Sequence, residues 1–308
     1  MADEKYESDF ESDSEGDESL LDVSPDDVEM GEMIGGGGLG LVYAAKWKKK
    51  EVAVKMLFDP RVSEALIKEF RDEAMVQWGL NHPNIVKLYA CCVKPPKMLM
   101  IFDKSDGSLF EVLHKQTYEL RRSEAWEIAL AVAKGMNHLH THNPKIIHRD
   151  LKSHNLLVYK KDGKYDWSAT KLCDFGLATV GARGAGTPCY MAPELHANKP
   201  YNEKVDVFAF GVLLCELVSL EVPFGGFTPF DIRSKVTKGE RPPLSRTCPR
   251  PIEKLIKECW HDEPKRRPSF AQVIEKLNDM EGKVRELDAS VAPSSLHFMG
   301  DSLDCLKL

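Results

Sequence analysis

The fold of this chain is decided by His148-Arg149-Asp150-Leu151-Lys152-Ser153-His154-Asn155, which is followed 19 positions after Asn155 by Asp174-Phe175-Gly176. This stretch contains the groups that phosphoryl transfer requires: an aspartate that can accept a hydroxyl proton, a nearby lysine and asparagine, and a second aspartate on a separate turn. A basic loop after a helix is the alternative interpretation. A pattern of this length, however, occurs by chance far less often than a lone glycine motif. The stretch therefore predicts a phosphoryl-transfer centre.

A glycine-rich stretch near the start of the chain supports this interpretation. It fits the pattern G-x-G-x-x-G-x-V and consists of Ile34, Gly35, Gly36, Gly37, Gly38, Leu39, Gly40, Leu41 and Val42. Without side chains, backbone amides can approach phosphate oxygens closely. On its own, such a tract is more often a flexible loop.

The apolar strand Val52-Ala53-Val54-Lys55 follows this glycine tract and ends in a lysine that can pair with the α and β phosphates. An ordinary strand lysine that extends into solvent is the alternative. A lysine in a partly buried cleft needs a counter-ion, and the helical periodicity from about Ser63 to Leu80 offers Glu73. Glu73 is preferred over Asp72 and Glu69 because Phe70 precedes it by three positions and His82-Pro83-Asn84 follows it.

With these motifs in order, the chain resembles the protein kinases, and among them the tyrosine-kinase-like group that includes the Raf, mixed-lineage and plant Raf-like kinases. The resemblance covers about residues 22–285. It also rests on the stretches Asp174 to Val180, Gly186-Thr187 to Tyr190-Met191-Ala192-Pro193-Glu194, Asp206 to Gly211, Cys259-Trp260 and Arg267 to Phe270. It implies an α+β fold with a small β-rich lobe carrying one main helix and a larger, mainly helical lobe.

The resemblance also implies roles for individual residues. Asp150 would be the catalytic base, Lys152 would contact the transferring phosphate, and Asn155 and Asp174 would hold Mg²⁺. Lys55 and Glu73 would form the ion pair of the small lobe, and Glu194 would pair with a buried Arg267. The ATP site would include the glycine tract, the gatekeeper Ile101, a hinge from Phe102 to Lys104, and also Ala53 and Leu157.

Charge is distributed unevenly and marks the first boundary. Residues 1–27 contain twelve Asp or Glu and one Lys, a net charge of −11, whereas the whole chain carries −6. We expect an acidic, disordered tail over 1–21. The kinase domain would span 22–285, with a small lobe over about 28–103 and a large lobe over about 104–285, and a short tail over 286–308 would follow. The acidic tail is interpreted first as a solubilising segment, and the alternative is a regulatory arm phosphorylated on its serines.

The composition argues against membrane-spanning, secreted and zinc-binding proteins. The apolar runs are all shorter than the roughly 18 residues of a membrane span, and the first residues lack the features of a signal peptide. The eight cysteines include no C-x-x-C pair, which suits a reducing compartment and argues against zinc. We therefore expect a cytoplasmic protein, with nuclear entry left open, and neither a nucleic-acid partner nor a membrane span.

Local patterns lead to four further expectations. Glu124 to His142 has helical periodicity, and Asp162-Gly163 predicts a protruding hairpin within 158–172. Gln77 occupies a position where relatives carry an aliphatic side chain, so an unpaired buried amide there would disfavour the active position of the helix. Thr179 is the expected activating phosphosite, with Arg149 as its phosphate partner and a regulatory kinase acting on it or on the acidic tail.

Three function classes remain open on these grounds. A kinase that uses ATP and Mg²⁺ to phosphorylate Ser or Thr of protein substrates is the leading one, with dual specificity as its variant. The second is a pseudokinase or scaffold, which the intact Lys55, Asp150, Asn155 and Asp174 disfavour. The third is a kinase for small hydroxyl compounds, which is disfavoured by the segment from Gly186 to Glu194, a peptide platform in the family that this chain resembles.

Overall fold

The computed structural model describes residues 23–37, 40–57, 63–95, 97–178 and 186–289. Its contacts divide the chain into two compact units. The described residues up to Ala74 and Leu88–Lys104 form the first unit, and Met75–Lys87 with the described residues from Ser105 on form the second. The lobe boundary expected from the sequence assigned residues 75–87 to the first lobe, whereas here they pack with the second unit.

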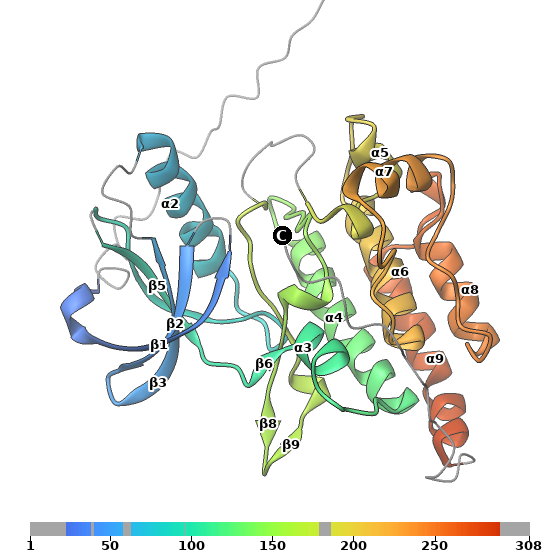
Figure 1. The fold of residues 1–308 in the computed structure, drawn as a ribbon, viewed down its shortest axis with the longest axis horizontal. Helices are drawn as coiled ribbons and strands as arrows, with labels where there is room; N and C mark the ends of the chain where they lie inside the picture. Colours follow the sequence, from blue (N-terminus) through green and yellow to red (C-terminus); the bar gives the residue numbers. More distant parts are fainter. Residues whose placement is uncertain (1–22, 38–39, 58–62, 96, 179–185, 290–308) are drawn as a thin grey trace, which may run out of the picture. The chain divides into compact units, whose positions relative to one another are not determined.

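The first unit is built on an antiparallel sheet, which lies on one side of the view in Figure 1. Its strand order is β1-β2-β3-β5-β4, and its members are β1 (Val28–Gly37), β2 (Gly40–Trp47), β3 (Lys50–Leu57), β4 (Leu88–Cys92) and β5 (Met98–Asp103). On β3, Val52 and Val54 are fully buried, and they pack in one cluster with Leu99 and Ile101 of β5. This alternation is expected of strands with one buried face.

The helix α2 (Glu64–Trp78) confirms the helix expected over about 63–80. Its residues Phe70, Glu73, Ala74 and Gln77 are buried, and each has another of them three or four positions away. These spacings place them on one face of the helix. The contact division falls after Ala74, so the last turn of α2 belongs to the second unit.

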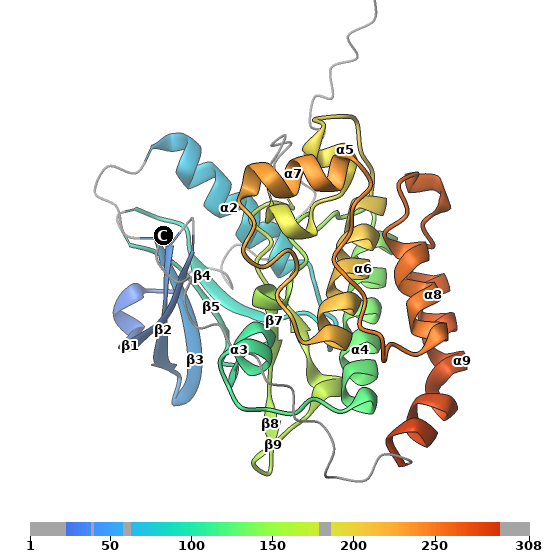
Figure 2. The same ribbon diagram turned by 45° about the vertical axis from the view of Figure 1, so that its right-hand side comes forward.

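The second unit is mainly helical. Its helices are α3 (Leu109–His114), α4 (Arg122–Thr141), α5 (Pro193–His196), α6 (Lys204–Ser219), α7 (Pro229–Thr237), α8 (Arg250–Cys259) and α9 (Phe270–Ala289). In this unit α9 packs along α4, and α8 packs along α6 (Figures 1 and 2). Helix α6 is buried on every side from Val205 to Leu217, which is typical of a central core helix.

The close approach of the end of α8 to α6 requires a glycine at position 211. A Cβ on Gly211 would lie 2.9 Å from the Cβ of Cys259 and 3.0 Å from the backbone nitrogen of Trp260. The end of α8 can therefore approach α6 only because position 211 has no side chain.

Short strands and single helical turns complete the second unit. A small sheet has the order β10-β7-β6, from β6 (Gly107–Ser108), β7 (Leu156–Val158) and β10 (Lys171–Leu172). The single 3-10 turns of this unit are η2 (Ser153–Asn155), η3 (Trp167–Ala169), η4 (Pro188–Tyr190) and η5 (Pro264–Arg266), whereas η1 (Pro25–Asp27) belongs to the first unit.

The predicted hairpin within 158–172 is confirmed. It consists of β8 (Lys160–Lys161) and β9 (Lys164–Tyr165), joined by Asp162 and Gly163. Both turn residues have positive φ, 52° and 75°, as a two-residue hairpin turn of type I′ requires.

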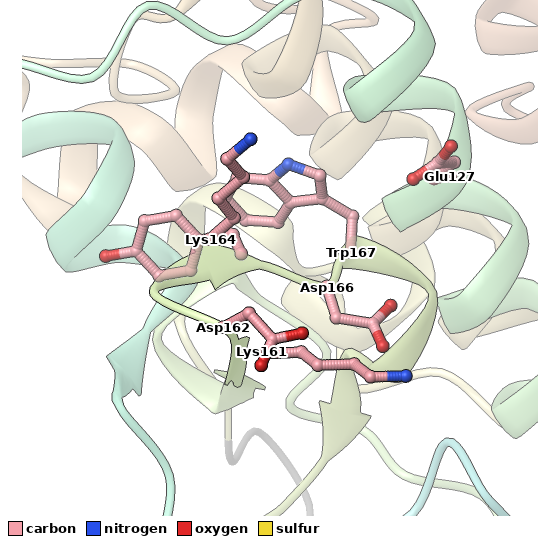
Figure 3. A pocket seen from close by; sticks show the side chains of 7 residues that line it. Glu127, Lys161, Asp162, Lys164, Asp166 and Trp167 are labelled. Atoms are coloured by element: carbon pink, nitrogen blue, oxygen red, sulfur yellow. The ribbon is translucent and has the colours of Figure 1, made fainter.

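A hollow of about 470 Å³ lies beside this hairpin (Figure 3). Its lining includes Glu127 of α4 and, from the hairpin side, Lys161, Asp162, Lys164, Tyr165, Asp166 and Trp167. Its carboxylates and amines largely balance one another in charge, so the lining does not define a class of ligand. None of these residues belongs to the predicted phosphoryl-transfer centre.

Candidate active site

The predicted ion pair of the first unit is present. Lys55 lies on β3, and its Nζ donates to both carboxylate oxygens of Glu73 on α2, at 2.6 Å and 2.9 Å. Both side chains are shielded, with 16% and 3% of their surfaces exposed. A bidentate pair in such surroundings holds the lysine amine at a fixed position.

The other predicted residues of the first unit lie on its strands. Residues 34–37 end β1 and residues 40–42 begin β2, and Gly37 pairs with Gly40 across the hairpin. Gly38 and Leu39 lie outside the described residues. Ala53 lies on β3, and Ile101 and Phe102 lie on β5, which ends at Asp103. Lys104 follows β5 and donates to Glu51 at 2.9 Å.

The expectation for Gln77 is wrong. The side chain is buried as predicted, but its amide is paired, because Nε2 donates to the carbonyl oxygen of Val86 at 2.7 Å. The chain turns back after α2 and brings this carbonyl to the last turn of the helix. The buried amide therefore carries no desolvation penalty that would disfavour the Lys55–Glu73 pair.

In the second unit, the predicted catalytic residues gather around the carboxylate of Asp150. Its Oδ1 accepts from the backbone nitrogen of Thr187 at 3.0 Å and from the Thr187 hydroxyl at 2.8 Å. Its Oδ2 accepts from Nδ2 of Asn155 at 3.0 Å and lies 2.7 Å from Nζ of Lys152. Nζ of Lys152 also donates to the Thr187 hydroxyl at 2.8 Å. These contacts fix the direction of the Asp150 carboxylate and place a cation beside it.

Asn155 and Asp174 are brought together by a short strand pair. Leu156 pairs with Leu172 between β7 and β10, and the backbone nitrogen of Cys173 donates to the Asn155 carbonyl at 3.0 Å. Because Nδ2 of Asn155 donates to the carboxylate and the carbonyl of Asp150, its Oδ1 is directed elsewhere. Of the predicted metal ligands, Asn155 thus directly precedes β7 and Asp174 follows β10 by two positions, and Leu157 lies on β7.

Two residues of this centre have a strained backbone. Arg149 and Asp174 have φ values of 64° and 67°, in the left-handed region that non-glycine residues rarely adopt. At Arg149 the cause is visible. The carboxylate of Asp206 on α6 accepts from the backbone nitrogens of His148 and Arg149, at 2.9 Å and 2.8 Å. These two bonds hold the start of the predicted catalytic loop (His148 to Asn155) in its unusual conformation.

Asp206 stays charged in the core because its partners compensate for burial. Burial alone would raise the pKa of this carboxyl, but hydrogen bonding and charge from His140 and a bond from the Arg149 backbone outweigh burial and lower the pKa. The His140 nitrogen Nε2 lies 2.8 Å from Oδ2 of Asp206. The sequence motif contained Asp206, but its position gave no indication of this anchoring role.

The expected partner of a phosphate on Thr179 is also buried. Nη1 of Arg149 donates to the Tyr201 hydroxyl at 3.0 Å, and only 7% of the arginine surface is exposed. Thr179 and the acidic tail lie outside the described residues, so both phosphorylation hypotheses stay predictions.

Lowering the pH should destabilise the protein through three histidines whose pKa values are lowered in the folded state. Burial is the first cause that lowers the pKa values of His82, His154 and His196 below 6.5. A lowered folded-state pKa means that the unfolded chain takes up protons first. The stabilisation is therefore complete above about pH 6.5 and is lost as the pH falls below it.

We expect the melting temperature to fall between pH 7.5 and 5.5 at constant ionic strength, as measured by scanning calorimetry. His196→Gln should flatten this dependence, because it removes one of the three groups. A melting temperature that stays constant over this range would contradict the assignment.

Comparison with known proteins decides the family. A profile described as protein tyrosine and serine/threonine kinase matches residues 28–277. The chain belongs to this family. It is 39% identical over 271 residues to the serine/threonine-protein kinase CTR1 of Arabidopsis thaliana. The aligned region covers 84% of this chain and 32% of CTR1. The predicted resemblance to Raf-like kinases and the predicted fold class are thereby confirmed.

Further relatives of this kinase domain come from distant organisms. It is 35% identical over 267 residues to the probable serine/threonine-protein kinase drkA of Dictyostelium discoideum, covering 84% of this chain and 41% of the relative. It is 36% identical over 273 residues to a putative serine/threonine-protein kinase/receptor, R818, of Acanthamoeba polyphaga mimivirus, covering 86% and 16%. The chain thus spans less than half the length of these curated relatives. In the described parts of the chain, every helix is too short or too polar to cross a membrane.

Proposed function

We propose that this chain is a protein kinase that transfers the γ-phosphate of ATP to serine and threonine hydroxyls of protein substrates. The observation that carries the proposal is the triangle of Asp150, Lys152 and Thr187, joined by contacts of 2.7 Å and 2.8 Å. The hydroxyl of a serine or threonine lies close to its own backbone, so the substrate backbone must lie near the base. A platform residue bonded directly to that base meets this requirement.

In this mechanism Asp150 accepts the proton of the substrate hydroxyl as its oxygen bonds to the γ-phosphorus and the bond to the leaving diphosphate oxygen breaks. Lys152 neutralises charge on the transferring phosphoryl group. Lys55, held by Glu73, would contact the α and β phosphates of ATP. The residues that would hold the rest of the nucleotide are the backbone of the glycine tract, for the phosphates, and Ala53, Ile101, Phe102, Lys104 and Leu157, for the adenine.

Members of this family use ATP and Mg²⁺ in general. In this chain the proposed Mg²⁺ ligands are Oδ1 of Asn155 and the carboxylate of Asp174. Both are hard oxygen donors beside adjacent strands. Within the described residues no cluster of three or more His, Cys, Asp or Glu could hold a metal ion. Two protein ligands nevertheless fit Mg²⁺, which keeps waters and binds substrate phosphates. When bound, the ion neutralises charge on the phosphates.

The proposed partners are protein substrates with a Ser or Thr acceptor and a regulatory kinase that acts on Thr179 or on the acidic tail. We also propose a cytoplasmic location. The eight cysteines of the chain include no C-x-x-C pair, which agrees with a reducing compartment.

The choice of acceptor is tested by incubating the protein with Mg²⁺, labelled ATP and a peptide library, followed by phosphoamino-acid analysis. We expect phosphoserine and phosphothreonine, with phosphotyrosine minor. Thr187→Ala should lower the transfer rate by about tenfold or more, because Asp150 and Lys152 lose the hydroxyl that spaces them. Comparable phosphotyrosine would indicate dual specificity. Predominant phosphotyrosine would refute the proposed class, and an inactive protein that still binds ATP would indicate a scaffold.

A further inference from the structure

The turn between β2 and β3 carries lysines at two positions whose backbone disfavours them. Lys48 and Lys49 form its two-residue loop, because Trp47 pairs with Lys50 across the hairpin. Their φ values are 47° and 64°, in the left-handed region where a type I′ turn favours asparagine and glycine. Both lysines are exposed, and the Lys48 amine lies 4.3 Å from the centre of the Trp47 ring. A strained turn that keeps two charged side chains points to a function for their charge.

The acidic N-terminal segment joins the first unit close to this turn. Val23 lies at β4, where its backbone nitrogen donates to the Cys91 carbonyl at 3.2 Å. Five positions later, Val28 pairs with Trp47, the residue that precedes the two lysines. Five residues of chain span at most about 18 Å, so residues 1–22 join the unit within reach of the turn.

The charges of the two segments are complementary. Residues 1–22 contain ten Asp or Glu and one Lys, whereas residues 48–50 are three consecutive exposed lysines. Lys97, near the point where the segment joins the unit, is already paired with Asp26 at 3.6 Å. A tethered segment meets a nearby site at a high effective concentration, so weak ionic contacts are enough to hold it there.

The turn is also connected to the predicted hinge. Nζ of Lys50 donates to the Tyr89 hydroxyl and to Oδ1 of Asp103, the latter at 3.5 Å. The Tyr89 hydroxyl in turn donates to Asp103 at 2.9 Å. The adjacent Glu51 accepts from Lys104 at 2.9 Å. A carboxylate that binds Lys50 from outside would therefore compete with a hinge residue for the same amine.

We propose that the lysine turn, Lys48 to Lys50, is a docking site for the acidic segment 1–22 of the same chain. Phosphorylation would strengthen this contact. Ser8, Ser12 and Ser14 each precede an acidic residue by three positions, and a phosphate adds nearly two negative charges. The docked segment lies beside the hinge contacts described above. Its effect on the hinge rests on the proposed function, whereas the docking itself is independent of kinase activity.

The test is zero-length carbodiimide cross-linking of the full chain, which joins a lysine amine to a carboxylate in contact with it, followed by peptide mass spectrometry. We expect cross-links from residues 1–22 to the lysine turn at low salt. They should fall by about fivefold or more in about 0.5 M NaCl, where surface charges are screened. A mixture of unlabelled and ¹⁵N-labelled chains identifies the source. Cross-links formed mainly between the two isotopes would assign the segment to a second copy and overturn docking within one chain.

The β8–β9 hairpin provides the matched control. Lys160, Lys161 and Lys164 are also exposed and also flank a two-residue turn. They should give about fivefold fewer cross-links to residues 1–22 than the lysine turn gives, because attraction between opposite charges alone does not supply a nearby tether. Equal cross-linking of the two turns would overturn the proposal.

Combining Lys48→Asn with Lys49→Gly tests the docking site without harming the fold. The double variant removes two charges and supplies the residues that a type I′ turn favours, so its melting temperature should equal or exceed that of wild type. Lys50 remains as the reporter. Its cross-links to residues 1–22 should fall by about fivefold or more, because two of the three attracting charges are gone. Lys50 cross-links that persist at the wild-type level would show that the turn is not the docking site.

Discussion

Replacing Asp150 with asparagine should lower the rate of phosphoryl transfer by roughly two to four orders of magnitude while changing the melting temperature little. The substitution keeps the shape of the side chain, so Thr187 and Asn155 can still pack around it. It removes the negative charge and the proton acceptor. Single-turnover kinetics with saturating ATP and peptide would measure the chemical step, and calorimetry on the same sample would measure stability.

The control for this experiment is Asp162→Asn. Asp162 is exposed in the β8–β9 turn and has a left-handed backbone, which asparagine adopts readily. The same chemical change there should leave the transfer rate as in wild type. If Asp150→Asn keeps the wild-type rate, Asp150 is not the base. If it loses activity together with the fold, its role is structural.

The second large effect concerns stability. Glu194→Gln should lower the free energy of unfolding by about 3–5 kcal/mol, because it leaves the Arg267 cation buried without its counter-charge. The guanidinium donates to both Glu194 oxygens, at 2.6 Å and 2.9 Å, and to the carbonyls of His261, Lys204 and Asp262. Only 2% of Arg267 is exposed. Such a loss is a large share of the roughly 5–15 kcal/mol typical of folded domains, and urea titration would measure it.

Glu253→Gln on α8 provides the comparison. Its partner Lys257 is four positions away, and their side chains are 36% and 60% exposed. Removing this pair should cost no more than about 0.5 kcal/mol. Equal losses of unfolding free energy in the two variants would show that burial does not increase the contribution of the Glu194–Arg267 pair to stability.

Local patterns predicted much of this molecule. The helices over 64–78 and 122–141 follow from apolar periodicity, and the hairpin follows from Asp162-Gly163. The Lys55–Glu73 and Glu194–Arg267 pairs were expected from motif resemblance, and both are present. Each of these features depends on residues within one short segment, or on motifs that occur in a fixed order along the chain.

The features that the sequence did not predict depend on partners far along the chain. Gln77 looked unpaired because nothing in its neighbourhood indicates that the Val86 carbonyl folds back onto it. The fully buried carboxylate of Glu216 on α6 was not predicted for the same reason, since its hydrogen-bond partners come from positions 114, 153 and 190. One signal was available for it. A carboxylate within a helix of otherwise apolar residues must have buried donors, although the sequence does not say which.

The β8–β9 hairpin has a consequence for how the chain can change in length. A side chain added at Gly163 would meet no atom within 4 Å, and the turn residues are exposed. Once a loop is flexible, each further doubling of its length costs only about 0.6 kcal/mol. Residues inserted between Asp162 and Gly163 would therefore leave β7 and β10, and the proposed metal ligands beside them, in register. We therefore expect this turn to tolerate insertions, both in natural sequences and when a fluorophore or an affinity tag is attached there.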